Sequence, residues 1–204
     1  MSTTSLQGPP VPANSVVSDW EKELEAEIPE NKCGLLDEEQ WRQLIRWLPV
    51  RYRVEDPRVV FRASVDGYNL TTLRRKCDNL DPILLVVKTL STPQKILGAF
   101  IPTDMHVQPG KYTGTGEAYI FRLDPDPMKF EWEPGQETLF MNNERHSFSV
   151  GGGNGVGLAL DGNLHTCTSE RCNTFCNPPL FGEETEHVVS DVEVITLHTA
   201  FEYC

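Results

Sequence analysis

Apolar residues recur at helical spacing along residues 35–49. The positions that follow the i, i+3, i+4, i+7 pattern are Trp41, Leu44, Ile45 and Leu48. Asp37 and Gln40 form the sequence pattern of a capping box ahead of them, and Pro49 ends the pattern. This stretch therefore predicts an amphipathic helix that packs one face against a core.

The chain before this helix has a different pattern. Residues 1–18 are mainly Ser, Thr, Pro, Gly and Asn, which is typical of a disordered segment. Residues 19–30 are acidic and carry a narrow apolar stripe, which predicts a short amphipathic helix. The stripe consists of Trp20, Leu24 and Ile28. We expect residues 1–35 to form an acidic N-terminal tail that includes this helix, and residues 36–204 to form one domain.

After this helix the pattern changes to short apolar runs and alternations, which predict β-strands. These segments are 58–63, 82–90, 95–102, 117–123, 129–133, 138–143, 147–153, 156–161, 163–167 and 187–197. Asn69 is placed to cap a short helix over residues 70–77, and Asp161-Gly162 is a strong hairpin signal. The order of elements predicts an α+β fold, a two-sheet antiparallel β-sandwich with flanking helices.

Charge is unevenly distributed along the chain. The formal net charge is −12, which argues against a nucleic-acid binder because phosphates would be repelled. Residues 1–39 carry −7 and residues 100–204 carry −11, whereas residues 40–99 carry +6. The basic residues either form solvated faces or gather into a patch for an acidic protein or a lipid headgroup.

Several features predict a cytoplasmic protein. No stretch approaches the length of about 20 apolar residues that crosses a bilayer, and the first residues lack the basic and apolar regions of a secretory signal. The six cysteines are then expected to be thiols. We expect membrane association, if any, to be peripheral and to depend on a partner.

Two glycine-rich loops raise the question of nucleotide binding. In the segment 110–123, Gly114 and Gly116 supply two glycines of a dinucleotide fingerprint, but Tyr119 occupies the third position and a strand follows. The loop at 151–157 fails the same test, because Leu158 stands at the third position. Neither loop precedes a predicted helix, so we interpret the glycines as bends with positive φ or close backbone approach, and expect no cofactor.

Glu117 could be a buried acceptor of backbone N–H groups or a catalytic acid. A single carboxylate carries no acid–base mechanism, because the chemistry also needs a partner group and a positioned substrate. The chain contains neither G-x-S-x-G nor H-E-x-x-H. We therefore expect a protein that is not an enzyme.

A cluster of sulfur and nitrogen ligands lies between residues 165 and 176. It consists of His165, Cys167, Cys172 and Cys176. Such a set can hold zinc, although its spacing is not that of a zinc finger, and ordinary loop and strand residues are the alternative. A third hypothesis is a redox thiol at Cys172, whose pKa the neighbouring Arg171 would lower.

The order of the motifs along the chain resembles the TLDc domain family. The segment Tyr112–Phe121 resembles its F/Y-x-G-T-G-E-x-F-x-F motif, and the match extends over roughly residues 36–200. The other matching segments are Asp66–Leu73, Pro82–Lys88, Gly98–Phe100, Val150–Gly155, Leu160–Leu164, Cys172–Asn177 and Asp191–Val194. The segments 47–51 and 70–73 are most similar to TLDc domains attached to Rab-regulating TBC domains.

The resemblance implies a β-sandwich without established enzymatic activity, linked to oxidative-stress resistance. It also implies binding and regulation of the V-type proton ATPase, and recruitment to endolysosomal or vesicle membranes. Alternatives are a thiol-based redox role of Cys172 and a role in Rab-dependent vesicle trafficking. The family-motif positions with a structural or binding role are Gly114, Gly116, Glu117, Gly151, Gly152, Gly153, Asp161, Thr174, Phe175 and Asn177.

The chain departs from the family pattern at three positions. Ala159 stands where tryptophan is frequent, and Asn69 stands where serine is usual. Cys176 occupies a position where glycine or asparagine is common. The roles carried over to the 165–177 segment depend on how the chain accommodates these changes.

Overall fold

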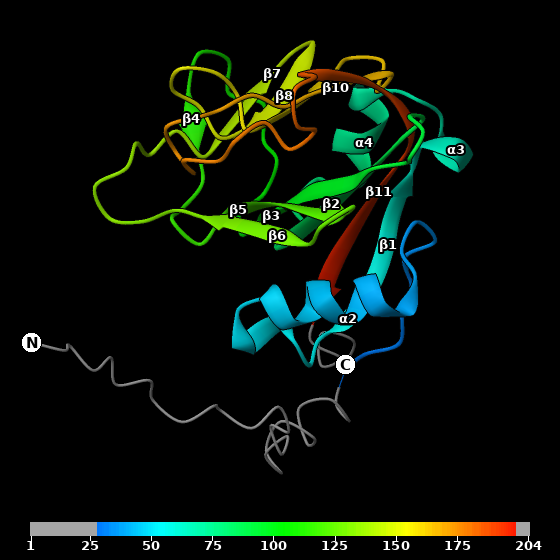
Figure 1. Ribbon diagram of the computed structural model, residues 1–204. Helices are drawn as coiled ribbons and strands as arrows, with labels where there is room; N and C mark the ends of the chain where they lie inside the picture. Colours follow the sequence, from blue (N-terminus) through cyan, green and yellow to red (C-terminus); the bar gives the residue numbers. More distant parts are fainter. Residues whose placement is uncertain (1–27, 199–204) are drawn as a thin grey trace, which may run out of the picture.

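Antiparallel strands dominate the computed structural model, which describes residues 28–198 (Figure 1). The helical elements are α2 (Glu38–Trp47), η1 (Val50–Tyr52), α3 (Ala63–Asp66) and α4 (Leu70–Lys76). The strands of the first half are β1 (Asp56–Arg62), β2 (Ile83–Thr89), β3 (Ile96–Ile101), β4 (Tyr112–Thr113), β5 (Tyr119–Asp124) and β6 (Met128–Glu131). Those of the second half are β7 (Met141–Glu144), β8 (Ser147–Val150), β9 (Leu158–Asp161), β10 (Thr166–Thr168) and β11 (Glu186–His198).

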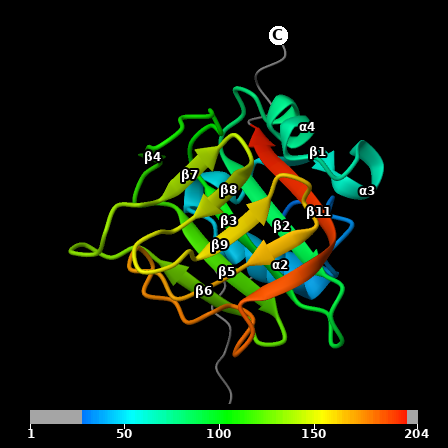
Figure 2. The same ribbon diagram turned by 90° about the horizontal axis from the view of Figure 1, so that it is seen from above.

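One hydrogen-bonded path joins these strands in the order β4-β7-β8-β9-β10-β11-β2-β3-β5-β6, with β1 also paired to β11. The start of β11 pairs with β10, and its later part pairs with β2 and β1. A register shift between Val189 and Asp191 interrupts the β11–β2 ladder, and such irregularities bend a strand. The path therefore folds over itself, so that β7, β8 and β9 cross above β2, β3 and β5 (Figure 2). We call β4 and β7–β10 the upper layer and β1, β2, β3, β5 and β6 the lower layer; β11 pairs with strands of both.

The prediction of a β-rich antiparallel fold with few helices is confirmed. The expectation of two separate sheets is not confirmed, because within residues 28–198 a single hydrogen-bonded path joins the strands of both layers. The physical reason is the length of β11, whose 13 residues are enough to pair with strands of both layers. No sequence pattern distinguishes a strand that belongs to two layers from one that belongs to a single sheet.

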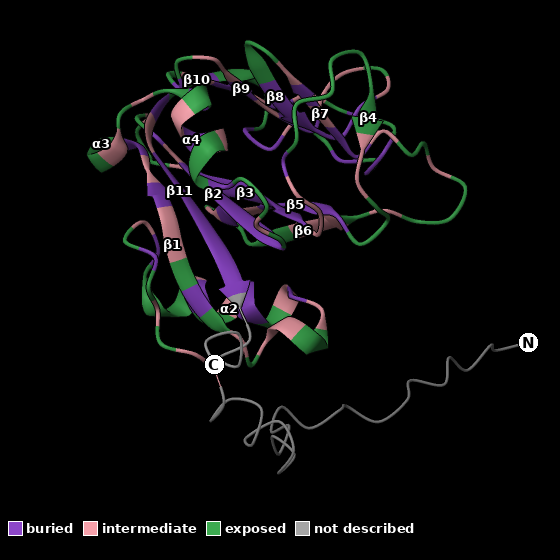
Figure 3. Cartoon of the chain, turned by 180° about the vertical axis from the view of Figure 1, so that it is seen from behind, coloured by how far each residue is buried: buried purple, intermediate pink, exposed green. Residues whose placement is uncertain are grey.

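Two apolar clusters fill the space around the lower layer of strands. One lies between the two layers, and the other lies between the lower layer and α2. Alternate residues of β2 enter each cluster: Leu85 and Val87 face the first, and Leu84 and Val86 face the second. A strand buried on both faces has a continuous apolar sequence, which explains the run at 82–90 and the burial of β2 in Figure 3.

The predicted capping box of α2 is confirmed. Gln40 N–H donates to the Asp37 carboxylate at 2.8 Å, and the Gln40 side chain accepts from Asp37 N–H at 3.1 Å. The predicted core positions are all buried, namely Trp41, Leu44, Ile45 and Leu48. The predicted cap of α4 is confirmed too, because the Asn69 side chain accepts from the N–H groups of Thr71 and Thr72.

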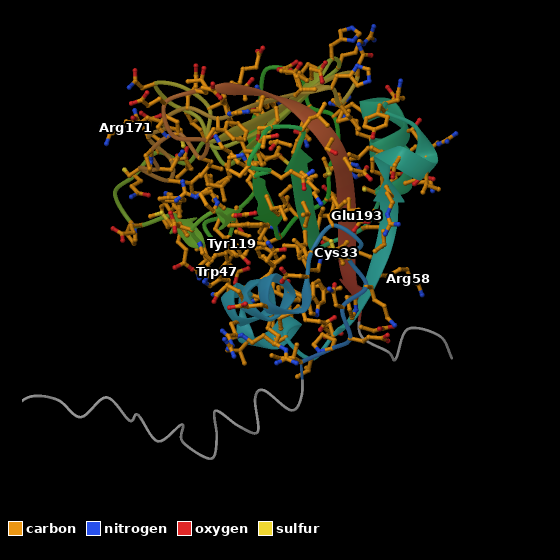
Figure 4. All side chains as sticks on the ribbon, turned by 45° about the vertical axis from the view of Figure 1, so that its right-hand side comes forward. Cys33, Trp47, Arg58, Tyr119, Arg171 and Glu193 are labelled. Atoms are coloured by element: carbon orange, nitrogen blue, oxygen red, sulfur yellow. The ribbon has the colours of Figure 1, made fainter. Side chains whose placement is uncertain are left out.

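A buried carboxylate attaches the segment before α2 to the sheet. The side chain of Glu193 on β11 is fully buried and accepts a hydrogen bond from Gly34 N–H at 2.9 Å. Arg62 of β1 forms an ion pair with the same carboxylate, outside hydrogen-bond geometry. Cys33 lies beside Glu193 (Figure 4), and burial, followed by the effect of this carboxylate, raises the pKa of its thiol.

The predicted tail is only partly within the described residues. Its disordered segment and nearly all of its short helix lie outside them, so both stay predictions. None of the helices in residues 28–198 combines the length and apolar character needed to cross a bilayer.

Candidate functional site

The turn before β5 is shaped by its two glycines. Gly114 has φ of +107°, a conformation that side chains rarely adopt. Gly116 lies under the ring of Trp132, where an added Cβ would approach the ring Cε3 to 2.6 Å. Ala118 N–H donates to Thr115 C=O at 3.0 Å and closes the turn. The turn is therefore a bend with close packing, as the sequence predicts.

Glu117 projects from this turn toward the segment after α2. Arg51 Nη2 donates to the Glu117 carboxylate at 2.5 Å, and both side chains are about half exposed, at 52% and 46%. The hydrogen bond from Arg51 holds the pKa of Glu117 below its ordinary value. Glu117 is therefore an exposed ion-pair partner. Of the two roles considered for Glu117, that of a buried acceptor of backbone N–H groups is wrong, because the side chain lies at the surface beside a cation.

Arg51 connects this ion pair to the core. Its guanidinium carbon lies 4.4 Å from the centre of the Tyr52 ring, a cation–π distance. The Tyr52 ring in turn lies 5.7 Å from that of Phe100 on β3, and Phe100 stacks on Tyr119 at 5.2 Å. The position of Glu117 is thus linked through aromatic contacts to the cluster beneath α2.

A groove of about 520 Å³ lies between the end of α2 and strands β5 and β6; we call it the α2–β6 groove. It is lined by residues 47–50, Arg53, Gly116, Glu117, Tyr119, Lys129 and 131–133. Figure 4 shows Trp47 and Tyr119 near each other where α2 meets the lower layer. The lining of the groove combines aromatic rings with charged side chains.

Aromatic packing fixes the walls of the α2–β6 groove. The Trp47 ring lies 6.2 Å from Phe121, and Trp132 packs edge-on against Phe140 at 5.8 Å. Lys129 Nζ lies 5.3 Å from the centre of the Tyr119 ring. Burial raises the pKa of Tyr119 well above its ordinary value, so its hydroxyl stays protonated.

The triple-glycine motif and the 172–177 segment come together in the upper layer. Gly151 has φ of +81°, and an added Cβ would lie 2.8 Å from both Cys172 Sγ and the Phe175 ring. Gly152 N–H donates to Thr174 Oγ1 at 3.2 Å. Gly153 has φ of +79°. These predicted positions therefore form one packed cluster, in a different part of the fold from the 114–117 turn.

The remaining motif polar residues organise backbone turns. Asp161 accepts from the N–H groups of His165 and Thr166 at 2.8 and 3.0 Å, which fixes the hairpin between β9 and β10. Asn177 is buried and donates to the carbonyls of Glu170 and Pro178. Both residues stabilise local structure.

The structure overturns the predicted activation of Cys172. Its side chain is 1% exposed, and Cys172 Sγ donates to Asn177 Oδ1 at 3.0 Å. Burial raises the pKa of the Cys172 thiol. Arg171 is exposed at the edge of the upper layer (Figure 4) and is not among the groups that shift this pKa. The prediction that Arg171 lowers it is therefore wrong: burial is the largest cause of the shift, and Arg171 makes no contribution to it.

The four residues of the zinc hypothesis do not form a ligand set. Within residues 28–198, no group of three or more His, Cys, Asp or Glu side chains is arranged to hold a metal ion. His165 packs against Tyr68, with ring centres 5.5 Å apart, while Cys167 is fully buried in β10. Cys176 is exposed and has φ of +48°. That φ explains why glycine or asparagine suits position 176.

Neither the α2–β6 groove nor the pairing of Arg51 with Glu117 follows from a pattern in the sequence. Arg51 and Glu117 are 66 positions apart, and no local pattern links them. One signal was available: Trp47 and Arg51 both lie in the 47–51 segment, which carries part of the family resemblance. A tryptophan and an arginine next to a helix-ending proline are the residue types that form binding surfaces.

Comparison with known proteins places the sequence motifs described above in the TLDc domain. The TLDc domain model matches residues 30–198. Nuclear receptor coactivator 7 of Gallus gallus is 35% identical over 165 residues, which are 80% of this chain and 18% of that protein. Oxidation resistance protein 1 of Xenopus laevis is 33% identical over 184 residues, 89% of this chain and 21% of that protein.

A third relative is the GTPase-activating protein skywalker of Drosophila melanogaster, which is 31% identical over 150 residues, 66% of this chain and 25% of that protein. The chain thus spans about a fifth of the length of the first relatives it matches. The family model covers most of the chain and includes both glycine motifs. The chain therefore belongs to the TLDc domain family.

Proposed function

We propose that this chain is a non-catalytic TLDc protein that protects against oxidative stress by binding and regulating the V-type proton ATPase. The observation that carries the proposal is its similarity to oxidation resistance protein 1 over 89% of the chain. In this proposal the protein is cytoplasmic, and the ATPase recruits it peripherally to endolysosomal or vesicle membranes.

The behaviour of the candidate reactive groups supports a binding role. Glu117 forms a surface ion pair with Arg51 that lowers the pKa of its carboxyl group, so at neutral pH it is an ionised salt-bridge partner and not a proton donor. Burial raises the pKa values of Cys33, Cys77, Cys167 and Cys172, which keeps these thiols protonated. Protection by contact with a larger assembly needs none of these groups.

Affinity purification tests the partner. The tagged full chain is purified from detergent-solubilised membranes, with a tagged protein of similar size and charge as the control. We expect V-ATPase subunits to be enriched over that control. Equal recovery in both samples would count against the ATPase as the partner.

Peroxide survival separates this proposal from the redox alternative. Cells that lack the protein are complemented with the wild-type chain, with Cys172→Ser or with Cys176→Ser. We expect both variants to protect as well as the wild type when they accumulate to equal levels. Loss of protection in Cys172→Ser alone, at equal abundance, would favour the thiol mechanism.

A further inference from the structure

Strand β6 ends the hydrogen-bonded path and leaves one of its edges without a partner strand. Within residues 28–198, β6 pairs with β5 alone. Figure 2 shows β6 as the strand of the lower layer that lies farthest from β11. No further backbone partner of residues 128–131 is found in the described part of the chain. The N–H and C=O groups on the outer side of β6 can therefore pair with an added strand.

Two prolines limit the stretch that an added strand can pair with. Pro127 comes directly before β6 and Pro134 follows soon after it. Because proline has no N–H to donate, a new ladder is confined to residues 128–133. If the added strand is β6 of a second copy in antiparallel orientation, a twofold axis passes through the centre of the ladder. With that axis at Phe130, residues 128–132 of the two copies pair with each other.

The charges of β6 favour this register. Lys129 and Glu131 both line the α2–β6 groove and pair with each other at 2.7 Å, so they lie on the same face of the strand. With the axis at Phe130, Lys129 of each copy lies opposite Glu131 of the other. Opposite charges across an antiparallel pair stabilise it, whereas like charges destabilise it. A lysine on an edge strand normally discourages pairing, but an identical antiparallel strand places a glutamate opposite it.

The apolar residues of β6 fit the same partner. Met128 is 41% exposed, although it is a large apolar residue. In this register it lies opposite Trp132 of the second copy, where sulfur and an aromatic ring can make contact. Phe130 lies opposite Phe130 of the second copy. Directly opposed side chains of this kind are the units that stabilise a β-sheet.

We propose that two copies of this chain associate by pairing the outer edges of β6 in antiparallel orientation, with a twofold axis at Phe130. The lower layers of the two copies then form one continuous sheet. The ladder is short, so the dimer is weak and dissociates on dilution. This inference concerns a second copy of the chain, and it stands or falls separately from the proposed binding to the ATPase.

Analytical ultracentrifugation of the purified full chain tests the proposal. Reducing conditions prevent disulfides between copies. We expect a monomer–dimer equilibrium between about 1 μM and about 500 μM protein, the range of weak complexes. Lys129→Glu and Glu131→Lys each place like charges opposite one another, and each should raise the dissociation constant of the dimer about tenfold. Lys111→Glu, the same charge reversal at an exposed residue before β4, is the matched control and should dimerise like the wild type.

Mixing the two variants separates strand pairing from a loss of structure. The Lys129→Glu chain has two acids on this face of β6 and the Glu131→Lys chain has two bases, so a dimer of one with the other again joins opposite charges. We expect the equimolar mixture to dimerise as tightly as the wild type. The double variant Lys129→Glu, Glu131→Lys restores both the internal ion pair and the cross-strand pairs, and it should also match the wild type.

Three results would overturn the proposal. The first is a wild-type chain that stays monomeric over the whole concentration range. The second is a dimer whose dissociation constant is the same in the wild type and in both single variants, because its interface would then lie elsewhere. The third is a loss of dimerisation in the single variants that neither the mixture nor the double variant restores.

Discussion

Arg51 and Glu117 form a 2.5 Å ion pair that joins the segment after α2 to the turn before β5. The carboxylate of the family's G-T-G-E motif is thus held by an arginine from a segment 66 residues away. The two glycines shape the turn, and Glu117 ties it to the rim of the α2–β6 groove. The motif therefore positions a surface.

A double-mutant cycle measures this ion pair. The variants Glu117→Gln, Arg51→Gln and their combination are compared by urea unfolding. Because both side chains are about half exposed, we expect a coupling energy of only about 0.2–1 kcal/mol. A coupling energy several times larger would mean that the pair is shielded from solvent.

The same pair has a predictable pH dependence. The pKa of Glu117 is depressed in the folded protein, so the ion pair stabilises the fold above the ordinary carboxyl value of 4.5. That contribution is lost as the pH falls from this value through the lower pKa of the folded state, where the carboxylate takes up a proton. Unfolding curves between pH 6 and 3 should therefore converge for wild type and Glu117→Gln. Curves that stay separated at pH 3 would contradict this assignment.

Gly151→Ala should destabilise the upper layer more than Gly182→Ala. Both glycines have a similar positive φ, +81° and +89°, but only Gly151 has close neighbours, Cys172 and Phe175. The shared conformation costs about 1–2 kcal/mol with alanine, and overpacking at Gly151 adds about 1–3 kcal/mol. Melting temperatures of the two variants isolate the packing cost. An equal decrease in melting temperature for the two variants would show that Phe175 and Cys172 move to accommodate the added methyl group at little cost.

Glu193→Gln should lower the free energy of unfolding by about 3 kcal/mol. This is the lower end of the range for breaking a buried ion pair, because Arg62 is partly exposed and regains some hydration. The amide keeps the shape of the side chain and can still accept from Gly34 N–H. Glu133→Gln, an exposed change of the same kind, is the control and should be neutral. Chemical denaturation of both variants checks the difference; a loss below about 1 kcal/mol would indicate that solvent reaches the site.

Thiol labelling should identify Cys176 as the most reactive described cysteine. Cys176 is exposed, whereas the other four are buried, and burial raises the pKa of the Cys77 thiol to about 12. Iodoacetamide labelling of the native protein at neutral pH, followed by mass mapping, gives the relative rates. If Cys172 were modified as fast as Cys176, the upper layer would have to open readily around the 172–177 segment.

Local patterns were sufficient for much of the fold. The capping box of α2, the cap at Asn69 and the hairpin at Asp161-Gly162 depend on residues only two to five positions apart, and the structure confirms each. The continuous apolar run of β2 also reflects its own burial on both faces. These features could be predicted because the interactions that cause them lie within the segment itself.

The candidate site depended on contacts that no segment encodes alone. The ion pair of Glu117 and the neighbours of Tyr119 come from segments distant in sequence. Cys172 shows the same effect in reverse: its neighbour Arg171 suggested activation, but burial against Gly151 and Phe175 determines its pKa. Positions of this kind follow from tertiary packing, which sequence periodicity does not report.

The continuity of β11 has a consequence for how the domain loses its structure. One strand supplies hydrogen bonds to β10 above and to β1 and β2 below, so melting either layer removes ladder partners from the other. Calorimetry should therefore show a single transition whose measured enthalpy equals the van't Hoff enthalpy. A partner protein that binds one layer would then protect the backbone amides of both layers from hydrogen exchange, because the two layers unfold together in one cooperative step.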